Sequence, residues 1–283
     1  MWTMLALMSA LNATPAQAGQ LELKNVRYTY GILGQERKET PYLPGDVVVI
    51  AFDIEGLKVA PNGQVQYSMS TELTGKEKDP GTNKPKVLFR KDPQNLVTVN
   101  TLGGSRLPSI AYTEIGVKTD PGEYTMTVVV TDVAAKATVK LERKFEVLRT
   151  QFGIVRPGFT YIDMNERGSG GTQIAPPVAV PGQSLQLNFA LVGFELDKSE
   201  KQLAKLSVKM EILDETGKPV LEKPFTGVAQ ELDAEYKNLR VSPFRFPMQI
   251  NRSGKFKIVL SAKDEITGKT ATQTLDLKVI EVN

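Results

Sequence analysis

The sequence contains no cysteine and no histidine. Without cysteine, the chain can form no disulfide, no thiolate nucleophile and no cysteine-ligated metal site. Without histidine, it lacks the usual general base, the usual partner of a nucleophilic serine and the commonest zinc ligand. These two absences exclude the most frequent types of hydrolase and zinc enzyme, and we expect no cofactor.

Runs of like charge are also missing. Residues 19–148 hold 17 Lys and Arg against 16 Asp and Glu, and the rest of the chain holds 18 against 16, which gives a net charge of +3. Proteins that bind nucleic acids or anionic membranes neutralise phosphates with clustered basic side chains. The even distribution of charge therefore predicts that nucleic acid is not a partner.

Long hydrophobic runs are absent beyond the first residues of the chain. Residues 2–11 form an apolar stretch that is too short to cross a bilayer, and Ala16-Gln17-Ala18 is an A-x-A cleavage site. This pattern predicts a signal peptide at residues 1–18, whose removal also removes Trp2, the only tryptophan. We expect an exported, periplasmic or extracellular protein with no transmembrane segment in the mature chain.

The sequence does contain a duplicated pattern of about 135 residues. In each copy, a Pro-Gly pair precedes a segment with apolar residues at alternate positions, and the segment ends at a glycine. The first copy has Pro44-Gly45, Val48, Ile50, Phe52, Ile54 and Gly56, and the second has Pro181-Gly182, Leu185, Leu187, Phe189, Leu191 and Gly193, each 137 positions later. A second pair of matching segments is Val65, Tyr67 and Met69 with Leu206, Val208 and Met210. A third is Gly122, Tyr124, Met126, Val128, Val130 and Asp132 with Gly254, Phe256, Ile258, Leu260, Ala262 and Asp264.

Alternation of apolar and polar residues is typical of antiparallel sheets with one buried face. About seven such strands in some 130 residues predict a β-sandwich, so the duplication predicts two tandem all-β sandwich domains, at residues 19–148 and 149–283. The outer strands are expected at residues 21–30, 137–148, 152–162 and 271–282. The only helix candidate is the short, charged segment 198–205.

Residues 120–126, with the sequence DPGEYTM, resemble the D-x-G-x-Y-x-C signature of the immunoglobulin fold. The resemblance implies two tandem Ig-like antiparallel sandwiches, with the Tyr124 hydroxyl in a "tyrosine corner" and Met126 replacing the bridging cysteine against Phe52 or Ile50. In the second copy, Phe256 has no hydroxyl for this bond. The YLPGD segment at residues 42–46 is also similar to the entry of macroglobulin-type sandwiches, so both families of secreted bacterial modules remain open.

Two loops contain candidate interaction residues. Residues 31–41 include Gln35 and Arg37, and form either a polar recognition loop or an ordinary solvated connection. Residues 102–108 include Ser105 and Arg106. This segment either binds an anionic group through Arg106, or forms a tight turn of positive-φ glycines in which Arg106 pairs with a neighbouring carboxylate.

Two further groups of residues suggest ligands. Asp163, Asn165 and Glu166 supply the oxygen atoms that calcium prefers, but they lack the order of a known calcium loop. A sugar-stacking platform could be formed by four tyrosines, which would otherwise be half-buried sheet residues. They are Tyr28, Tyr30, Tyr112 and Tyr161.

These observations favour a non-enzymatic exported module that binds a protein or an extracellular polymer, or acts as a structural spacer at the cell envelope. The alternative is an accessory module that binds a glycan or another ligand. A hydrolase with a pair of catalytic carboxylates is the function that the sequence supports least, because no carboxylate pair has a sequence context typical of an active-site cleft.

Overall fold

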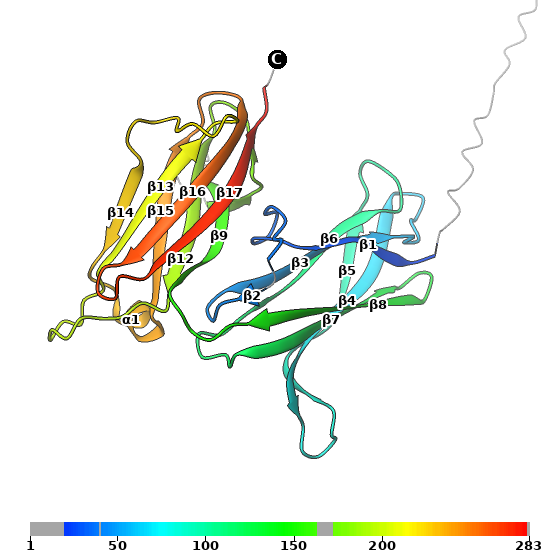
Figure 1. Cartoon of the computed structure of the whole chain (residues 1–283). Coiled ribbons are helices and arrows are strands. Elements are labelled where there is room, and N and C mark those ends of the chain that lie inside the picture. Colours follow the sequence, from blue (N-terminus) through cyan, green and yellow to red (C-terminus); the bar gives the residue numbers. More distant parts are fainter. Residues whose placement is uncertain (1–19, 40, 163–171, 282–283) are drawn as a thin grey trace, which may run out of the picture.

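The computed structural model of the protein describes residues 20–39, 41–162 and 172–281 (Figure 1). The expected all-β class is confirmed, since strands make up 60% of the chain and helix 2%. The predicted signal peptide and the candidate calcium ligands Asp163, Asn165 and Glu166 lie outside the described residues. No helix in the described part of the chain is long and apolar enough to span a membrane.

The first unit, residues 20–147, contains eight strands in two sheets. The strands are β1 (Glu22–Tyr28), β2 (Pro41–Tyr42), β3 (Val47–Glu55), β4 (Gln64–Lys78), β5 (Pro85–Val99), β6 (Leu107–Glu114), β7 (Gly122–Asp132) and β8 (Ala137–Val147). One sheet has the order β1-β3-β6 and the other β2-β8-β7-β4-β5. All neighbours are antiparallel except β2 and β8.

The second unit, residues 153–281, contains nine strands and one helix. They are β9 (Gly153–Ile162), β10 (Thr172–Ala175), β11 (Val178–Ala179), β12 (Ser184–Val192), β13 (Leu206–Leu213), β14 (Phe225–Ala229), α1 (Ala234–Leu239), β15 (Val241–Gln249), β16 (Gly254–Asp264) and β17 (Thr270–Val279). The sheet orders are β10-β9-β12-β15 and β11-β17-β16-β13-β14. These two strand orders match the orders of the first unit strand by strand, except that β10 is an additional edge strand. The pair β11–β17 is parallel, as β2–β8 is in the first unit.

Each unit has its own core between its two sheets. The apolar residues of the duplicated pattern face inward, because alternate side chains of a strand point to opposite faces. In the first unit the core includes Ile50, Phe52 and Met126, all at most 1% exposed, and in the second it includes Leu187 and Ile258. Met126 and its expected neighbours Phe52 and Ile50 therefore belong to one packed cluster that needs no disulfide.

The conserved spacing of Asp132 and Asp264 within the duplication has a structural reason. Each carboxylate is fully buried and caps the turn between the last two strands of its unit, where it accepts hydrogen bonds from following backbone N–H groups. Each also accepts a backbone N–H from the loop after the β3 or β12 strand, from Lys58 at 2.7 Å and from Glu195 at 3.2 Å. These bonds tie a loop between the sheets to a turn in both units.

The prediction of a helix at residues 198–205 is wrong. That segment is an irregular connection in which the Asp197 carboxylate accepts bonds from Ser199 N, Ser199 Oγ and Leu203 N. These bonds, led by the one from the Ser199 hydroxyl, lower the pKa of Asp197 to about 2. Local side-chain bonds of this kind compete with helical backbone bonds. The helix that does form, α1, has no buried residue and was not predicted.

Candidate functional site: the cleft between the units

The first strand of the second unit is interrupted by a bulge that directs Arg156 toward the first unit. In the pairing of β9 with β12, Val155 lies opposite Ala190 and Gly158 opposite Asn188, so Arg156 and Pro157 together face a single residue. Arg156 has a left-handed φ of 53°, which is uncommon for a residue other than glycine. Bulges re-aim side chains and often occur beside functional sites, and here the bulge places Arg156 at the junction of the units.

Asp46 is the acceptor at the centre of this junction. Its Oδ1 accepts Val47 N at 2.8 Å and Arg156 N at 3.1 Å, and its Oδ2 accepts Arg37 Nη1 at 2.7 Å. The side chain is only 4% exposed. A buried carboxylate with three donors, two of them from other segments, holds those segments together.

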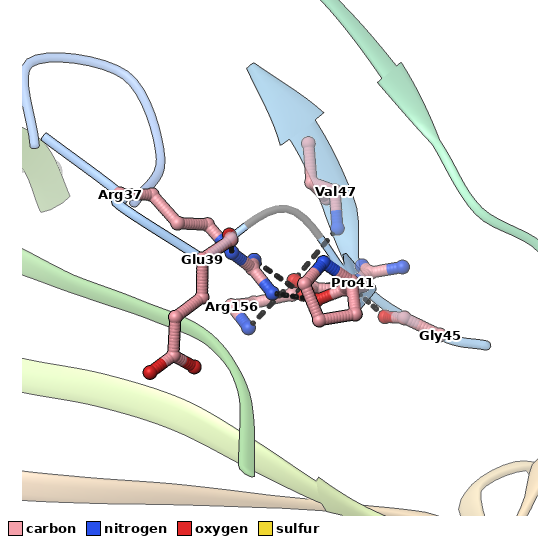
Figure 2. A network of polar contacts seen from close by, with 7 residues as sticks. Arg37, Glu39, Pro41, Gly45, Val47 and Arg156 are labelled. Atoms are coloured by element: carbon pink, nitrogen blue, oxygen red, sulfur yellow. Dashed lines mark hydrogen bonds and ion pairs between the residues drawn. The ribbon is translucent and has the colours of Figure 1, made fainter. Parts of the chain in front are cut away.

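Arg37 and Arg156 approach the 45–47 turn from opposite units (Figure 2). Arg156 Nε donates to Gly45 O at 2.6 Å and its Nη2 to Glu114 at 3.3 Å. Arg37 donates to Pro41 O and Glu39 O, and its guanidinium lies over the Tyr42 ring at 3.9 Å. The Arg37 side chain is 11% exposed, and each of its three nitrogens already donates to an acceptor of the first unit.

Gln35 connects the same loop to the second unit. Its Oε1 accepts Asp276 N at 2.6 Å, and its Nε2 donates to Thr274 O at 3.4 Å. The side-chain amide thus pairs with β17 much as the backbone of a neighbouring strand would. The loop is sharply turned at Gly34, where any Cβ would lie 1.7 Å from Tyr30 O, so only glycine fits. Gln35 therefore joins the two units directly, whereas Arg37 bonds only to residues of the first unit and contributes by holding Asp46.

Apolar contacts complete the junction. Val155, Ala190 and Val192 form a small buried cluster of the second unit, and Leu43 of the first unit packs against it. Gly45 lies so close to Val192 Cγ1 that a Cβ would be 3.0 Å away, and Leu43 Cδ1 fills the space beside Gly153. The two units therefore meet through a packed contact as well as through hydrogen bonds.

Beside this junction lies a cleft of about 400 Å³ between the outer faces of two sheets. One wall comes from the first unit, where Tyr30, Val49 and Tyr112 line it. The other wall comes from β9, β10, β12 and β15 of the second unit, and Arg156 and Pro157 lie between the walls. Ligand sites commonly occupy clefts of this size between domains.

The wall formed by the second unit carries a row of polar side chains beside the apolar side chain of Ile174. Leu187 points into the core, so its neighbours Gln186 and Asn188 point into the cleft. Asn188 Nδ2 donates to Thr160 Oγ1 at 2.7 Å. Arg245 lies directly across from Asn188 on β15 and lines the same cleft. Among the described residues it takes part in no salt bridge.

The charged side chains of the cleft are mostly paired. Among the described residues, the carboxylates that line it are Asp46 and Glu114, and both pair with arginines. Within the part of the chain that the structure describes, no group of three or more metal-ligating side chains occurs. The cleft therefore offers amide, hydroxyl, guanidinium and phenol groups around an open space.

The other predicted loop does not reach this cleft. Arg106 Nη2 pairs with Asp53 Oδ2 at 2.7 Å, and Asp53 also accepts Asn25 Nδ2 at 2.6 Å. The tight turn in this segment is present, since Gly103 and Gly104 have φ values of 77° and 82°. Ser105 is partly exposed beside it. The structure thus matches the alternative in which Arg106 pairs with a neighbouring carboxylate.

The four candidate tyrosines are not on one platform. Tyr30 and Tyr112 both line the cleft, and Tyr112 is 49% exposed. Tyr28 packs on the first core and donates to Lys144 O, while Tyr161 does not line the cleft. Arg156, Asn188 and Arg245 were missed, because each is an ordinary outward-facing strand residue in the sequence. The only available signal was polarity at the outward positions of β12.

Comparisons with known proteins add little. No family model matches the chain, and no curated protein matches it. Among solved structures, a crystal structure of red sea bream transglutaminase is 7% identical, with a TM-score of 0.26, over 94% of this chain and 32% of that one. The chain thus spans about a third of that protein's length, and a likeness this weak carries no argument.

Proposed function

We propose that this protein is an exported, non-enzymatic binding module of two tandem Ig-like domains, residues 19–148 and 149–283. In this proposal, the cleft between the units holds part of an extracellular polymer or protein at the cell envelope. The observation that carries it is the junction at Asp46, Arg156 and Gln35, beside which two sheet faces enclose a cleft lined by both polar and apolar side chains.

The Ig-like assignment is supported by the strand order and by one hydrogen bond. With β1, β3 and β6 as strands A, B and E, and β4, β7 and β8 as C, F and G, the first unit has the A-B-E and C-F-G grouping of immunoglobulin sheets. Tyr124 Oη donates to Asp120 O at 2.6 Å, as a tyrosine corner requires. The second unit repeats the order without the tyrosine.

The non-enzymatic assignment is supported by the state of the cleft carboxylates. Glycoside hydrolysis needs two carboxyl groups that face the scissile bond, whereas Asp46 is occupied by three donors and Glu114 pairs with Arg156. Fold similarity alone would not choose between these roles. The proposal therefore depends on the cleft.

Gly158 provides a direct test of the cleft. A Cβ at this position would meet no atom within 4 Å, and its φ is not left-handed, so a larger side chain can enter the cleft without strain. We expect Gly158→Leu to fold normally and to abolish binding. Thr272→Leu, at an exposed position of β17 that does not line the cleft, adds a similar side chain and should bind normally.

The experiment is calorimetric titration of the mature protein with dextran, mannan, polygalacturonate and soluble peptidoglycan fragments. Binding of any of these that is lost in Gly158→Leu and kept in Thr272→Leu supports the proposal, and chromatography of the recovered probe should show it uncleaved. Binding that persists in Gly158→Leu, or no binding by any probe, contradicts it. Sequencing the exported protein should give Gly19 as its first residue.

A further inference from the structure

We propose that the cleft binds a carboxylated sugar residue of an acidic polysaccharide. This inference depends on the proposed function, because it takes the cleft as the binding site, and it adds the chemical class of the ligand. Three features of the cleft lead to it: a polar row, an aromatic residue on the facing wall and the guanidinium group of Arg245.

The polar row suits a ligand with many hydroxyl groups. Gln186 and Thr160 are register partners on adjacent strands, and Asn188 follows two residues after Gln186 on the same face. Side-chain amides and hydroxyls both donate and accept hydrogen bonds, as sugar hydroxyls do. The Asn188–Thr160 bond fixes the row before any ligand enters, which lowers the entropy lost on binding.

The facing wall supplies a flat apolar surface. Tyr112 is about half exposed, and its register partner Val49 lies beside it on β3. A tyrosine ring in a partly open position can pack against the apolar face of a sugar while its hydroxyl remains in water. This arrangement places a ring on one wall and hydrogen-bonding groups on the other.

Arg245 adds the preference for a carboxylate. It is the register partner of Asn188 and lines the cleft, so it extends the polar row. Arg37 is already held by Asp46 and Tyr42, and Arg156 by Gly45 O and Glu114, so neither of these two adds a free charge. Guanidinium groups bind carboxylates through paired hydrogen bonds. A uronic acid combines the carboxylate with the hydroxyls that the row can bind.

A peptide fits this cleft less well than a sugar does. Extended peptides bind by pairing with the free edge of a sheet, but the cleft is lined by sheet faces, which present side chains. The free edge of β15 is also interrupted by Pro243 and Pro247, which cannot donate a backbone hydrogen bond. An acidic peptide is therefore the competing ligand that the experiment has to reject.

The test is titration calorimetry of the mature protein with four probes of similar size. They are trigalacturonate, its methyl ester, a neutral galactose trisaccharide and triglutamate. We expect trigalacturonate to bind at least tenfold more tightly than the other three, and its affinity to fall as salt is added. Arg245→Gln should weaken that binding at least tenfold, Arg245→Lys should weaken it less, and Lys269→Gln, on an exposed turn, should not change it.

The outcomes separate this inference from the proposed function. Suppose that the neutral trisaccharide, the methyl ester or triglutamate binds as tightly as trigalacturonate, and that Gly158→Leu abolishes that binding. The proposed ligand class is then wrong, but the cleft is still the binding site. If Gly158→Leu and Arg245→Gln both leave all binding unchanged, both proposals fail. Melting curves of each variant establish that it is folded.

Discussion

At the scale of single residues, the two carboxylates that pair with arginine at the junction differ in their burial. Asp46 joins three segments and is almost completely buried with Arg37. Glu114 pairs with Arg156 at the rim, where both side chains are largely exposed. Removal of one partner from a buried pair leaves an uncompensated charge, whereas an exposed pair is weakened by water and salt.

Asp46→Ala should therefore lower the free energy of unfolding by about 3–5 kcal/mol. Glu114→Ala, the matched change at the exposed pair, should lower it by less than about 1 kcal/mol. Urea unfolding followed by circular dichroism measures both. Equal effects of the two substitutions would show that the Asp46 network is not the main tie at the junction.

Asp53 gives a prediction about pH. Burial tends to raise its pKa, but the hydrogen bonds from Asn25 and Arg106 outweigh burial and hold the pKa below its usual value. A carboxyl group whose pKa is lowered by folding stabilises the protein above its unfolded pKa of about 3.9, and this stabilisation is lost as the pH falls through the folded pKa.

Asp53→Asn should accordingly cost about 1–2 kcal/mol at pH 7, and the difference from the natural protein should shrink as the pH is lowered from 5 to 3. Urea midpoints at pH 7, 5 and 3 test this. Asp92→Asn, at an exposed position of β5, is the control and should have little effect at any of these pH values. A difference that grows toward low pH would contradict the assignment.

At the scale of strands and turns, alternation of apolar residues located the core strands well. The segments that it predicted at residues 137–148 and 152–162 correspond to β8 (Ala137–Val147) and β9 (Gly153–Ile162). It missed β5, whose residues 87–89 are all apolar and all exposed, so the strand shows no alternation. It also missed the β9 bulge, because neither Arg156 nor Pro157 distinguishes a bulge from a regular strand in sequence.

The tyrosine bond at the start of β7 can be tested at this scale. Tyr124→Phe removes the hydrogen bond to Asp120 O and keeps the packing of the ring against Phe145. We expect a loss of about 1 kcal/mol in the unfolding free energy. Tyr236→Phe, on the exposed helix α1, is the matched control and should have almost no effect. If both variants lost the same amount of unfolding free energy, the Tyr124 hydrogen bond would make no special contribution to stability.

At the scale of the whole molecule, the link between the two units consists of only a few residues. The orientation of one unit relative to the other depends on contacts between residues outside this link. Arg156 and Gln35 bridge the units by bonds between residues that are more than 100 positions apart in the chain. A short link limits how far the units can separate, and these bonds select one orientation within that limit.

Arg156→Ala should therefore broaden the distribution of distances between the units without unfolding either core. Because the protein has no cysteine, spin labels can be attached to Asn95→Cys and Thr272→Cys, one exposed site in each unit, and the distance distribution measured by pulsed electron resonance. Arg149→Ala, at an exposed position in the link, should leave the distribution narrow. An unchanged distribution in Arg156→Ala would mean that apolar packing alone sets the orientation.

The pattern of residues along the chain was enough to predict the all-β class and the residues of the two cores, because side-chain alternation is a local property of a strand. The same pattern also singled out the 31–41 loop and four tyrosines as candidate interaction residues. The packing of the two units decides that Gln35 bonds to the second unit, that Arg37 is held by Asp46, and that Asn188 and Arg245 line the same cleft as Tyr112. Those groups come from strands far apart in the chain, and their meeting depends on how two folded units pack, which no local pattern encodes.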